Sequence, residues 1–509
     1  MTLNVAASDS LGSDDKHTRK VALGEGAVLR LDSDDNSVTQ TVGAIAGGAD
    51  DSTSTVDLAA SSKLTIDGQT DSVFGILKGK NASITLEAGD LTILSADEDH
   101  LFDGEAFIGS TEGNTASLTV KAQHGLGTAT VQIGANDKFV VDADDDDTLL
   151  NSMKGQGSVH FTGTGKRPLT GASVFTGGLY VEKGVVAAED AGGVLAGAML
   201  GNGDLHLTGG SLTVNTSADW DLESHGHLLI GSGTLVVVRK DTHQGDFTFA
   251  EGQTAQAEPL FTGTLDLSNI TIGFDEAVNT NKSALKSASL VVNQNAQANF
   301  NETGVAFKTL GVKENGILDF SSMAAMVGTT TAENAVHADA FDFSGASGAK
   351  VRVDMADAFL NEIPEPEGPV AAASLLDQDN GDILLRLGVL NKQSSTPVDV
   401  SKIGLEIKND KGGFDAASEA PYSLTVDITQ STAGGSVETV ADGIYNLGLS
   451  GDETGWGIAH QLDEVSIYDG KTLRLLQGKD NALSAKITEK GDAWAAVTGQ
   501  VHMPVTASV

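Results

Sequence analysis

The segment Leu205-His206-Leu207-Thr208-Gly209-Gly210-Ser211-Leu212-Thr213-Val214 decides the fold class. It contains two short runs in which apolar and polar residues alternate, separated by a pair of glycines. Alternation with a period of two is typical of a strand that buries one face. Glycine permits the tight bend or the positive φ that a corner between two strands needs. The segment therefore predicts two strands that meet at a glycine corner.

Similar alternating runs recur along most of the chain. Their spacing is mostly about 20–28 residues, which indicates an internal repeat. Such a unit is too short to hold a helical crossover and too regular for an irregular sandwich. The runs are residues 63–66, 83–86, 117–120, 130–133, 158–161, 178–181, 204–207, 227–230, 264–267, 289–292 and 309–312.

Two architectures could use these units: a series of hairpins in a sandwich, or a parallel β-helix in which each rung stacks on the one before. Hairpins favour Asn-Gly or Asp-Gly between their strands, and Asn315-Gly316 is one such corner. The recurring period favours the solenoid. We expect an all-β parallel β-helix, or β-solenoid, with glycine corners.

The repeat pattern predicts four segments. Residues 1–40 are polar and irregular and are expected to form an N-terminal cap, followed by β-helix rungs over 41–331. A break near 332–370 contains Ile363-Pro364-Glu365-Pro366-Glu367-Gly368-Pro369, which cannot continue a strand ladder. We therefore expect an irregular interruption over 332–381, rich in Pro, Ala and Asp, and further rungs over 382–509.

The composition excludes several classes of function. The 509 residues include 70 Asp and Glu against 31 Lys and Arg, a net charge of −39 that would repel nucleic acids and anionic membranes. Cysteine is absent, which excludes disulfides, a thiol nucleophile and Cys-ligated metals. The first ten residues do not resemble a signal peptide, and no apolar run of about 18 residues suggests a membrane span. We expect no cofactor, no nucleic-acid partner and no membrane insertion by this chain.

Two stretches resemble a known family. Phe175-Thr176-Gly177-Gly178-Leu179-Tyr180-Val181-Glu182-Lys183-Gly184 resembles the YTGGTxVxxGxL strand repeat of autotransporter passengers, with Phe in place of Tyr. Residues 440–445 and 455–462, continued by 470–475 and 481–487, are similar to a passenger module near the C-terminal stem. The family is the type V autotransporters, and in particular the AIDA-type adhesins.

The resemblance implies a right-handed β-helix exported across the outer membrane to the surface of a Gram-negative bacterium. It also implies a non-enzymatic adhesin that mediates self-association, aggregation and biofilm formation with neighbouring cells. Binding of a host matrix protein or glycosaminoglycan in a groove of the helix is the alternative. The lack of a signal peptide, of a translocator barrel and of cysteine fits an excised passenger that crosses the outer membrane unfolded.

Motifs for catalysis are scarce. The protease class of autotransporters carries Gly-Asp-Ser-Gly, which does not occur here, and neither does Gly-x-Ser-x-Gly. A polysaccharide lyase or hydrolase is the remaining enzymatic alternative, because β-helices host both. A hydrolase needs two carboxylates at a fixed separation, and 70 acidic residues make their mere presence uninformative. We expect no enzymatic activity.

Acidic residues follow the second strand of many units, and aligning the units predicts an acidic ridge along one corner. It could act as a docking edge or a weak Ca²⁺ site, or simply keep the solenoid soluble and its edges unpaired. The candidate binding residues are Asp97, Asp99, Asp142, Asp144, Asp145, Asp219, Asp221, Asp241, Asp246 and Asp275.

The 11 histidines are dispersed along the chain. The nearest approach to a cluster is His225-Gly226-His227 with His243. Aligning the repeats places His227 level with Asp204 and His206 opposite Leu229, so these rings are not expected to stack, and no metal site is expected.

Overall fold

A computed structural model describes residues 1–490 except 9–10, 12–18, 34–36, 48–51, 69, 98, 100, 110–113, 123, 241–244, 255–258, 276–277, 303, 323–334, 355–369, 372–382, 384, 409–410, 418–422, 432–436 and 468–482. The chain divides into two compact units, Met1–Ile270 and Thr271–Val509, and each is described here by itself.

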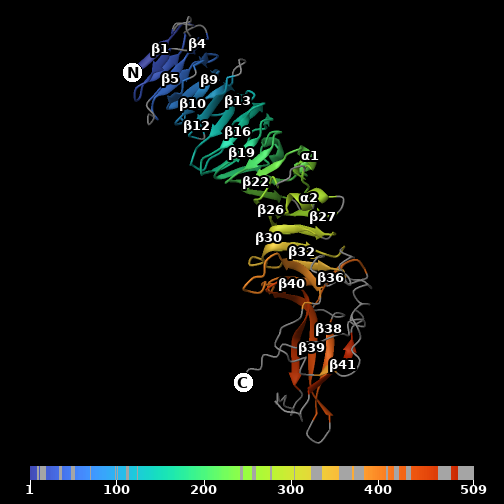
Figure 1. Ribbon diagram of the computed structural model, residues 1–509. Coiled ribbons are helices and arrows are strands. Elements are labelled where there is room, and N and C mark those ends of the chain that lie inside the picture. Colours follow the sequence, from blue (N-terminus) through green and yellow to red (C-terminus); the bar gives the residue numbers. More distant parts are fainter. Residues whose placement is uncertain are drawn as a thin grey trace. The chain divides into compact units, whose positions relative to one another are not determined.

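In the first unit, short parallel strands stack turn upon turn into three sheets (Figure 1). The first sheet contains β1 (Thr2–Val5), β3 (Val28–Leu31), β6 (Thr55–Leu58), β9 (Ile76–Leu86), β11 (Asp103–Ile108), β13 (Thr130–Ile133), β15 (Ser152–Gly155) and β18 (Val174–Phe175), with β4 (Thr39–Val42) and β7 (Lys63–Ile66) attached through β9.

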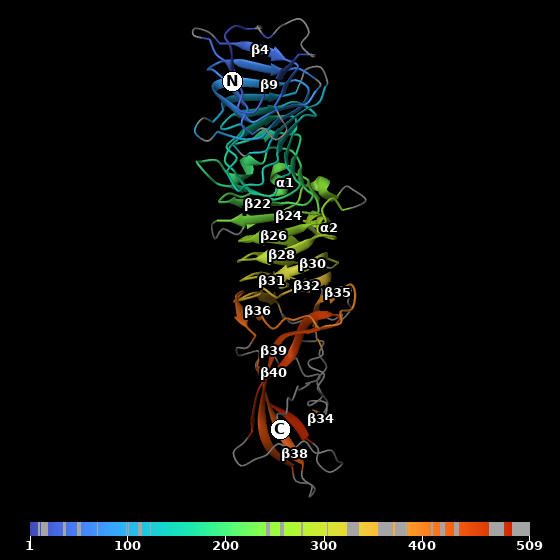
Figure 2. The ribbon, with the colours of Figure 1, turned by 90° about the vertical axis from the view of Figure 1, so that its left-hand side faces the viewer.

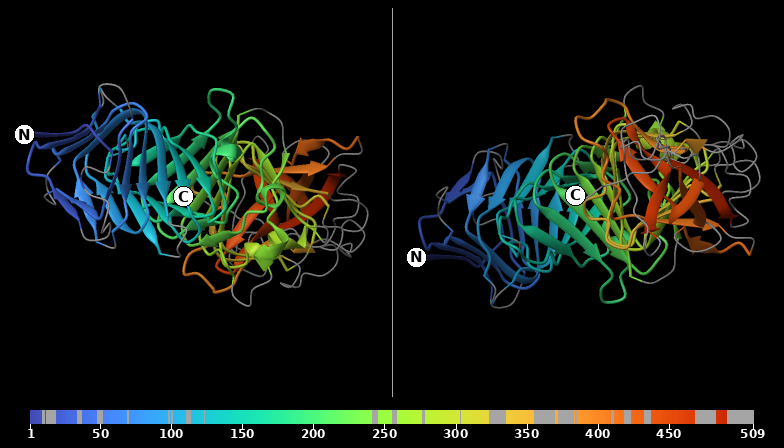
Figure 3. Two further views of the ribbon diagram at one scale, coloured as in Figure 1. Left: turned by 90° about the horizontal axis from the view of Figure 1, so that it is seen from above. Right: turned by 90° about the horizontal axis from the view of Figure 1, so that it is seen from below.

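The second sheet runs beside it along the same turns, which Figure 3 views from above and below. It contains β2 (Lys20–Ala22), β5 (Ala44–Ala46), β8 (Ser72–Phe74), β10 (Gly89–Ile93), β12 (Ala116–Val120), β14 (Lys138–Val141), β16 (Ser158–Phe161), β19 (Leu179–Val181), β21 (Leu205–Leu207) and β23 (Leu229–Gly231).

A third sheet begins later in the unit, with β17 (Lys166–Leu169), β20 (Val185–Glu189), β22 (Ser211–Thr216), β24 (Thr234–Arg239) and β26 (Thr264–Ser268). The remaining elements of the unit are the short strand β25 (Gly245–Asp246), the one-turn helix α1 (Leu222–His225) and the 3₁₀ turns η1 (Ala196–Met199) and η2 (Glu251–Thr254).

In the second unit, two sheets continue in parallel, as the stack of β28, β30 and β32 in Figure 2 illustrates. One sheet has β27 (Ile270–Phe274), β29 (Gln297–Phe300), β31 (Ile317–Asp319), β33 (Lys350–Val353) and β36 (Gly404–Lys408), followed by the antiparallel β37 (Phe414–Ala416). The other has β28 (Ser289–Asn293), β30 (Ala306–Val312), β32 (Val336–Asp342) and β35 (Leu385–Leu390). Helix α2 (Asn279–Ala284) lies between β27 and β28 in sequence.

The predicted fold class is confirmed. The chain is an all-β solenoid of parallel stacked sheets with about 12 turns. Within the part that the structure describes, no helix is long and apolar enough to cross a membrane.

The core is built from rows of inward-facing side chains in register on successive strands. In the first sheet, Leu64 lies level with Ile84, and Ala106 follows on β11. All three side chains are buried. Each fully buried large aliphatic side chain contributes about 1.5–3 kcal/mol relative to exposure. Because this inward position is apolar on β7, β9 and β11, these turns share one core; on β4 the level residue is the buried Gln40.

The corners use residues that tolerate a positive φ. Gly89, with φ of 77°, opens β10 immediately after β9. Asn315, with φ of 56°, lies between β30 and β31, which belong to different sheets. The Asn-Gly pair at residues 315–316 therefore forms a solenoid corner and not the tight turn of a hairpin.

Two predicted boundaries differ from the observed structure. The expected N-terminal cap over 1–40 already contains β1, β2 and β3, which pair in parallel with later turns. The expected interruption over 332–381 contains the solenoid strands β32 and β33. The prolines at residues 364, 366 and 369 lie outside the described residues.

Among the described residues of the expected further rungs over 382–509, β35 and β36 continue the parallel pairing. Beyond β35 in the order of the sheet, the strands pair antiparallel: β40 (Gly455–Ile467), β39 (Val437–Asp452), β38 (Ser423–Ser431), β41 (Leu483–Lys490) and the earlier segment β34 (Val370–Ala371).

The link between β39 and β40 explains the change to antiparallel pairing. Asp452 accepts hydrogen bonds from the backbone N–H and the hydroxyl of Thr454, both at 2.7 Å. Gly455 has a φ of 156°. A two-residue link between long alternating runs closes a hairpin, whereas parallel strands need a longer connection.

Candidate binding surfaces

The predicted acidic residues that follow β10 and β14 are held by neighbouring turns. Asp97 forms an ion pair with Lys78 and accepts a hydrogen bond from the backbone N–H of Asp99 at 3.0 Å. Asp142 accepts from Lys121 Nζ at 2.7 Å and is one of the side chains that link this turn to its neighbours. These carboxylates therefore hold turns of the solenoid together.

Asp144 also links neighbouring turns of the solenoid through hydrogen bonds. Its Oδ1 accepts hydrogen bonds from both the backbone N–H and the hydroxyl of Thr164, each at 2.9 Å. The hydrogen bond from the Thr164 backbone, followed by that from its hydroxyl, lowers the pKa of Asp144 below its ordinary value. Asp145 is exposed in the same loop.

The later candidates cap local turns or pair with a cation. Asp219 lies 2.7 Å from Arg239 Nη1. Asp221 is the N-cap of α1 and accepts from the backbone N–H of Ser224 at 2.6 Å, as expected of Asp at a helix start. Asp275 accepts from the backbone N–H of Val278 at 3.0 Å.

The nine candidates that the structure describes follow strands of different sheets. The first five follow strands of the second sheet, whereas Asp219 and Asp221 follow β22 of the third sheet. Asp246 lies in β25, and Asp275, in the second unit, follows β27. Asp241 lies outside the described residues. The alignment missed this because the strands preceding the acids belong to different sheets.

The alignment of the histidines was wrong by one residue. Leu205 pairs with Leu229, so His206 lies level with Ile230 and not with Leu229. The run Leu228-Leu229-Ile230 is apolar at every position, so its period does not choose between the two registers. In the observed register, His227 is fully buried and its Nδ1 lies 2.7 Å from the carbonyl oxygen of Gly203.

The observed register also forms a stacked row of rings that the alignment had not suggested. His160, Tyr180 and His206 occupy the same outward position on β16, β19 and β21. Their ring centroids are 4.2 and 4.0 Å apart, with nearly parallel planes. His160 also bonds Glu182 at 3.1 Å, so this row is internally paired.

The outward face of the first sheet carries a different set of side chains. Thr41, Thr65 and Thr85 lie level on β4, β7 and β9, and all three are half-buried. We call the two outward rows that run over β4, β7, β9, β11, β13 and β15 the threonine face. Its members are Thr39, Lys63, Ser83, Glu105, Thr130 and Ser152 in one row, and Thr41, Thr65, Thr85, Phe107, Gln132 and Lys154 in the other.

The threonine face is close to neutral although the chain is strongly acidic. It holds two lysines, Lys63 and Lys154, against one acid, Glu105, while the chain as a whole has a net charge of −39. An identical copy would therefore meet less repulsion here than over most of the chain.

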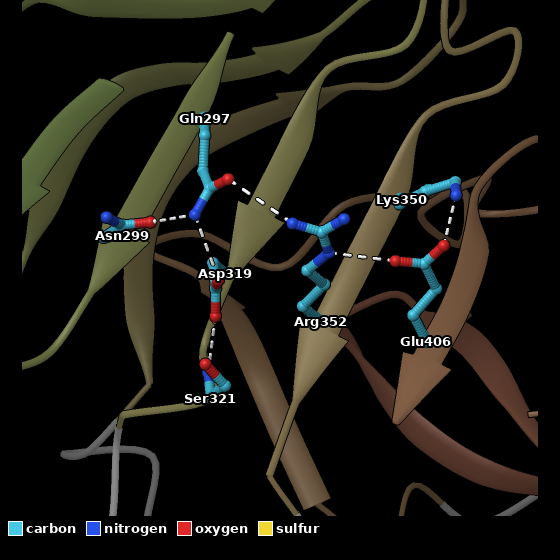
Figure 4. Close-up of polar contacts among 7 residues, drawn as sticks. All are labelled: Gln297, Asn299, Asp319, Ser321, Lys350, Arg352 and Glu406. Atoms are coloured by element: carbon cyan, nitrogen blue, oxygen red, sulfur yellow. Dashed lines mark hydrogen bonds and ion pairs between the residues drawn. The ribbon is translucent and has the colours of Figure 1, made fainter. Parts of the chain in front are cut away.

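The second unit has a closed polar network on the sheet of β29, β31, β33 and β36, shown in Figure 4. Glu406 accepts from Arg352 Nε at 2.9 Å and from Lys350. Burial alone would raise the pKa of Glu406, but these two cations lower it. Gln297 joins the network by donating to Asp319 at 3.1 Å and accepting from Arg352 at 3.4 Å. The groups satisfy one another and tie the four strands together.

A pocket of about 330 Å³ lies where the first sheet ends. After β18, the chain forms η1 and then α1 in the following turns instead of further strands of that sheet. Val174, Gly197, Trp220 and His225 line the pocket from these three elements and the segment before α1. Asp219 and Asp221 were predicted as binding residues because they are acidic, whereas Trp220 between them carried no sequence signal.

Asp190 fixes two walls of this pocket. Its carboxylate accepts from the backbone N–H of Ala196, at the start of η1, and from the backbone N–H and hydroxyl of Ser217. Burial alone would raise the pKa of Asp190, but the hydrogen bonds from Ser217 and Ala196 outweigh it and lower the pKa to about 2. The carboxylate is therefore charged, and the pocket walls are pinned, at any neutral pH.

Comparison with family models, curated proteins and solved structures found no match. Among the described residues, the threonine face and the pocket beside Trp220 are the surfaces on which the proposals below are built.

Proposed function

We propose that the chain is a non-enzymatic adhesin whose solenoid associates side by side with a second copy through the threonine face. The resemblance to AIDA-type passengers supports a place at the surface of a Gram-negative bacterium. In that setting, self-association would join neighbouring cells and promote aggregation and biofilm formation.

The observation that carries the proposal is the near-neutral, registered threonine face on a chain of net charge −39. Rows of hydroxyl and amide side chains repeat at the strand spacing of about 4.8 Å. Each contact would be weak, but their number raises the affinity through multivalency. The acidic residues are poorer candidates, because most of them bind atoms of their own solenoid.

Sedimentation velocity over a wide concentration range at moderate salt tests this proposal. We expect reversible dimers for the wild-type chain. The double variant Thr65→Asp/Thr85→Asp adds two charges at level positions of the face, and we expect it to remain monomeric because like charges would then oppose each other across the interface.

The matched control is Ser211→Asp/Thr234→Asp. These residues are also half-buried and level with each other on neighbouring strands, but they belong to the third sheet. It adds the same charge and should dimerise like the wild type. If both variants lost their dimers equally, the effect would come from the total charge, and the threonine face would be rejected as the interface. A strictly monomeric wild type would reject self-association, and host matrix proteins and glycosaminoglycans would then be screened as ligands.

A further inference from the structure

We propose that the pocket between β18, η1 and α1 binds one ring of a neutral sugar. This site is separate from the threonine face and would give the chain a second, heterotypic ligand. Three observations support it: the indole N–H of Trp220 has no partner among the described residues, Gly197 lies against both Trp220 and His225, and the rim of the pocket is apolar.

Trp220 supplies the first observation. Its side chain is 2% exposed, and its Nε1–H has no hydrogen-bond partner among the described residues. Buried donors in native proteins are nearly always paired, so an unpartnered one beside a pocket calls for an acceptor from outside the chain. A ligand oxygen would meet that need.

Gly197 brings Trp220 and His225 to one space. A Cβ at residue 197 would lie 2.9 Å from Trp220 Nε1 and 3.4 Å from His225 Nε2. Any larger residue would therefore crowd both nitrogens. His225 is exposed and lines the same pocket.

The two nitrogens have complementary roles. His225 Nδ1 lies 3.2 Å from the carbonyl oxygen of Asp221 and 2.8 Å from Ser224 Oγ. A carbonyl oxygen only accepts, so Nδ1 carries the proton and Nε2 of the neutral ring is an acceptor. The pocket lining thus holds one donor, Trp220 Nε1, and one acceptor, His225 Nε2. A hydroxyl group, which accepts and donates at once, matches this pair.

The rim of the pocket suits the ring and the other hydroxyl groups of a sugar. Val174 and Leu195 are 54% and 47% exposed, and both line the pocket. They offer apolar surface to the C–H groups of a ring, while the exposed amide of Asn202 can bond further hydroxyls.

Charge disfavours an anionic ligand. The Asp219 carboxylate at the pocket is largely exposed, although it is paired with Arg239, and the chain is strongly acidic. A purely apolar side chain from a second copy would leave the Trp220 donor unpaired. A volume of about 330 Å³ lies at the lower end of small-molecule pockets, roughly 300–1,000 Å³, so we assign one sugar ring.

The test uses the full chain labelled with ¹⁵N. Methyl α-D-glucopyranoside, methyl β-D-galactopyranoside and N-acetyl-D-glucosamine are titrated separately to tens of millimolar while the indole N–H resonances are followed. The chain has three tryptophans, and Trp220→Phe identifies the resonance of Trp220. We expect at least one sugar to shift that resonance saturably while the other indole resonances stay in place.

Affinities are then measured by calorimetry on variants. Leu195→Ser and Trp220→Phe should each weaken binding by about tenfold, the factor that corresponds to one lost contact. Leu3→Ser is the matched control, since Leu3 is 45% exposed and far from the pocket in sequence, and it should bind like the wild type. Trp220→Phe removes buried ring volume and should lower the unfolding midpoint modestly, so its affinity is measured well below that midpoint.

Three results would overturn the assignment: no saturable shift with any of the three sugars, equal binding of D-glucuronate, or unchanged affinity in Trp220→Phe. Loss of dimers in Leu195→Ser would also overturn it and assign the rim to a second copy. Sugar binding and self-association are tested independently, since Thr65→Asp/Thr85→Asp should lose the dimer but bind the sugar with wild-type affinity.

Discussion

At the scale of single residues, His227 illustrates how the register of one strand buries a histidine and thereby lowers its pKa. Its ring is fully buried and its Nδ1–H donates to the carbonyl oxygen of Gly203. Burial lowers the pKa of His227 below its ordinary 6.5, and the charge of a protonated His225 adds to this. The hydrogen bond to Gly203 and the carboxylate of Asp204 act in the opposite direction but are outweighed.

A pH dependence of stability follows. The unfolded chain binds a proton at His227 more readily than the folded chain, so stability is complete above about pH 6.5 and falls as the pH drops toward the lower folded pKa. We expect His227→Asn, which keeps a side-chain donor but does not titrate, to flatten the decline of the urea midpoint between pH 7 and pH 5. Gln253→Asn, a change at another buried polar residue that does not titrate, is the control and should keep the wild-type slope. An unchanged slope in His227→Asn would contradict the argument.

At the scale of elements, the corner at Gly109 shows why glycine recurs in the repeat. Gly109 follows β11 with φ of 113°. A Cβ there would collide with the carboxylate of Asp137. That carboxylate is buried and accepts a hydrogen bond from the backbone N–H of Ala116 at 2.7 Å. Moving Asp137 would therefore break a buried bond between two turns.

We expect Gly109→Ala to destabilise the first unit by at least about 1–3 kcal/mol, the usual strain of a non-glycine residue in such a conformation. Gly24→Ala is the matched control, because a Cβ at residue 24 would meet no atom within 4 Å. Urea unfolding followed by circular dichroism compares the two. Equal midpoints for both variants would show that the corner at residue 109 can relax.

The elements also show what the sequence could predict. Strands such as Lys63–Ile66, Thr130–Ile133 and Ser158–Phe161 have the predicted bounds, because alternation and glycine corners are local signals. The pocket could not be found this way. Val174, Gly197 and Trp220 come from different turns and line one pocket. They lie close together because the first sheet ends there, and no local sequence pattern predicts where a sheet ends. The antiparallel C-terminal strands were missed because period-two alternation is the same in either direction.

At the scale of the whole molecule, the net charge of −39 opposes any association of identical chains, including association through a nearly neutral face. Long-range repulsion is set by the screening length, which is roughly 30 Å at 0.01 M salt and roughly 10 Å at 0.1 M. Contacts between hydroxyl and amide groups on the threonine face are short-ranged and hardly screened. Raising the salt should therefore remove repulsion without removing attraction.

We accordingly expect the association constant of the wild-type dimer to rise between 0.01 M and 0.1 M salt, measured by sedimentation velocity at fixed pH. The control variant Ser211→Asp/Thr234→Asp should show the same trend with a slightly steeper slope, because it carries two more negative charges. Weaker dimers at higher salt would contradict this argument. They would mean that ion pairs, for example between Lys63 and Glu105 of opposing copies, hold the interface in place of uncharged contacts.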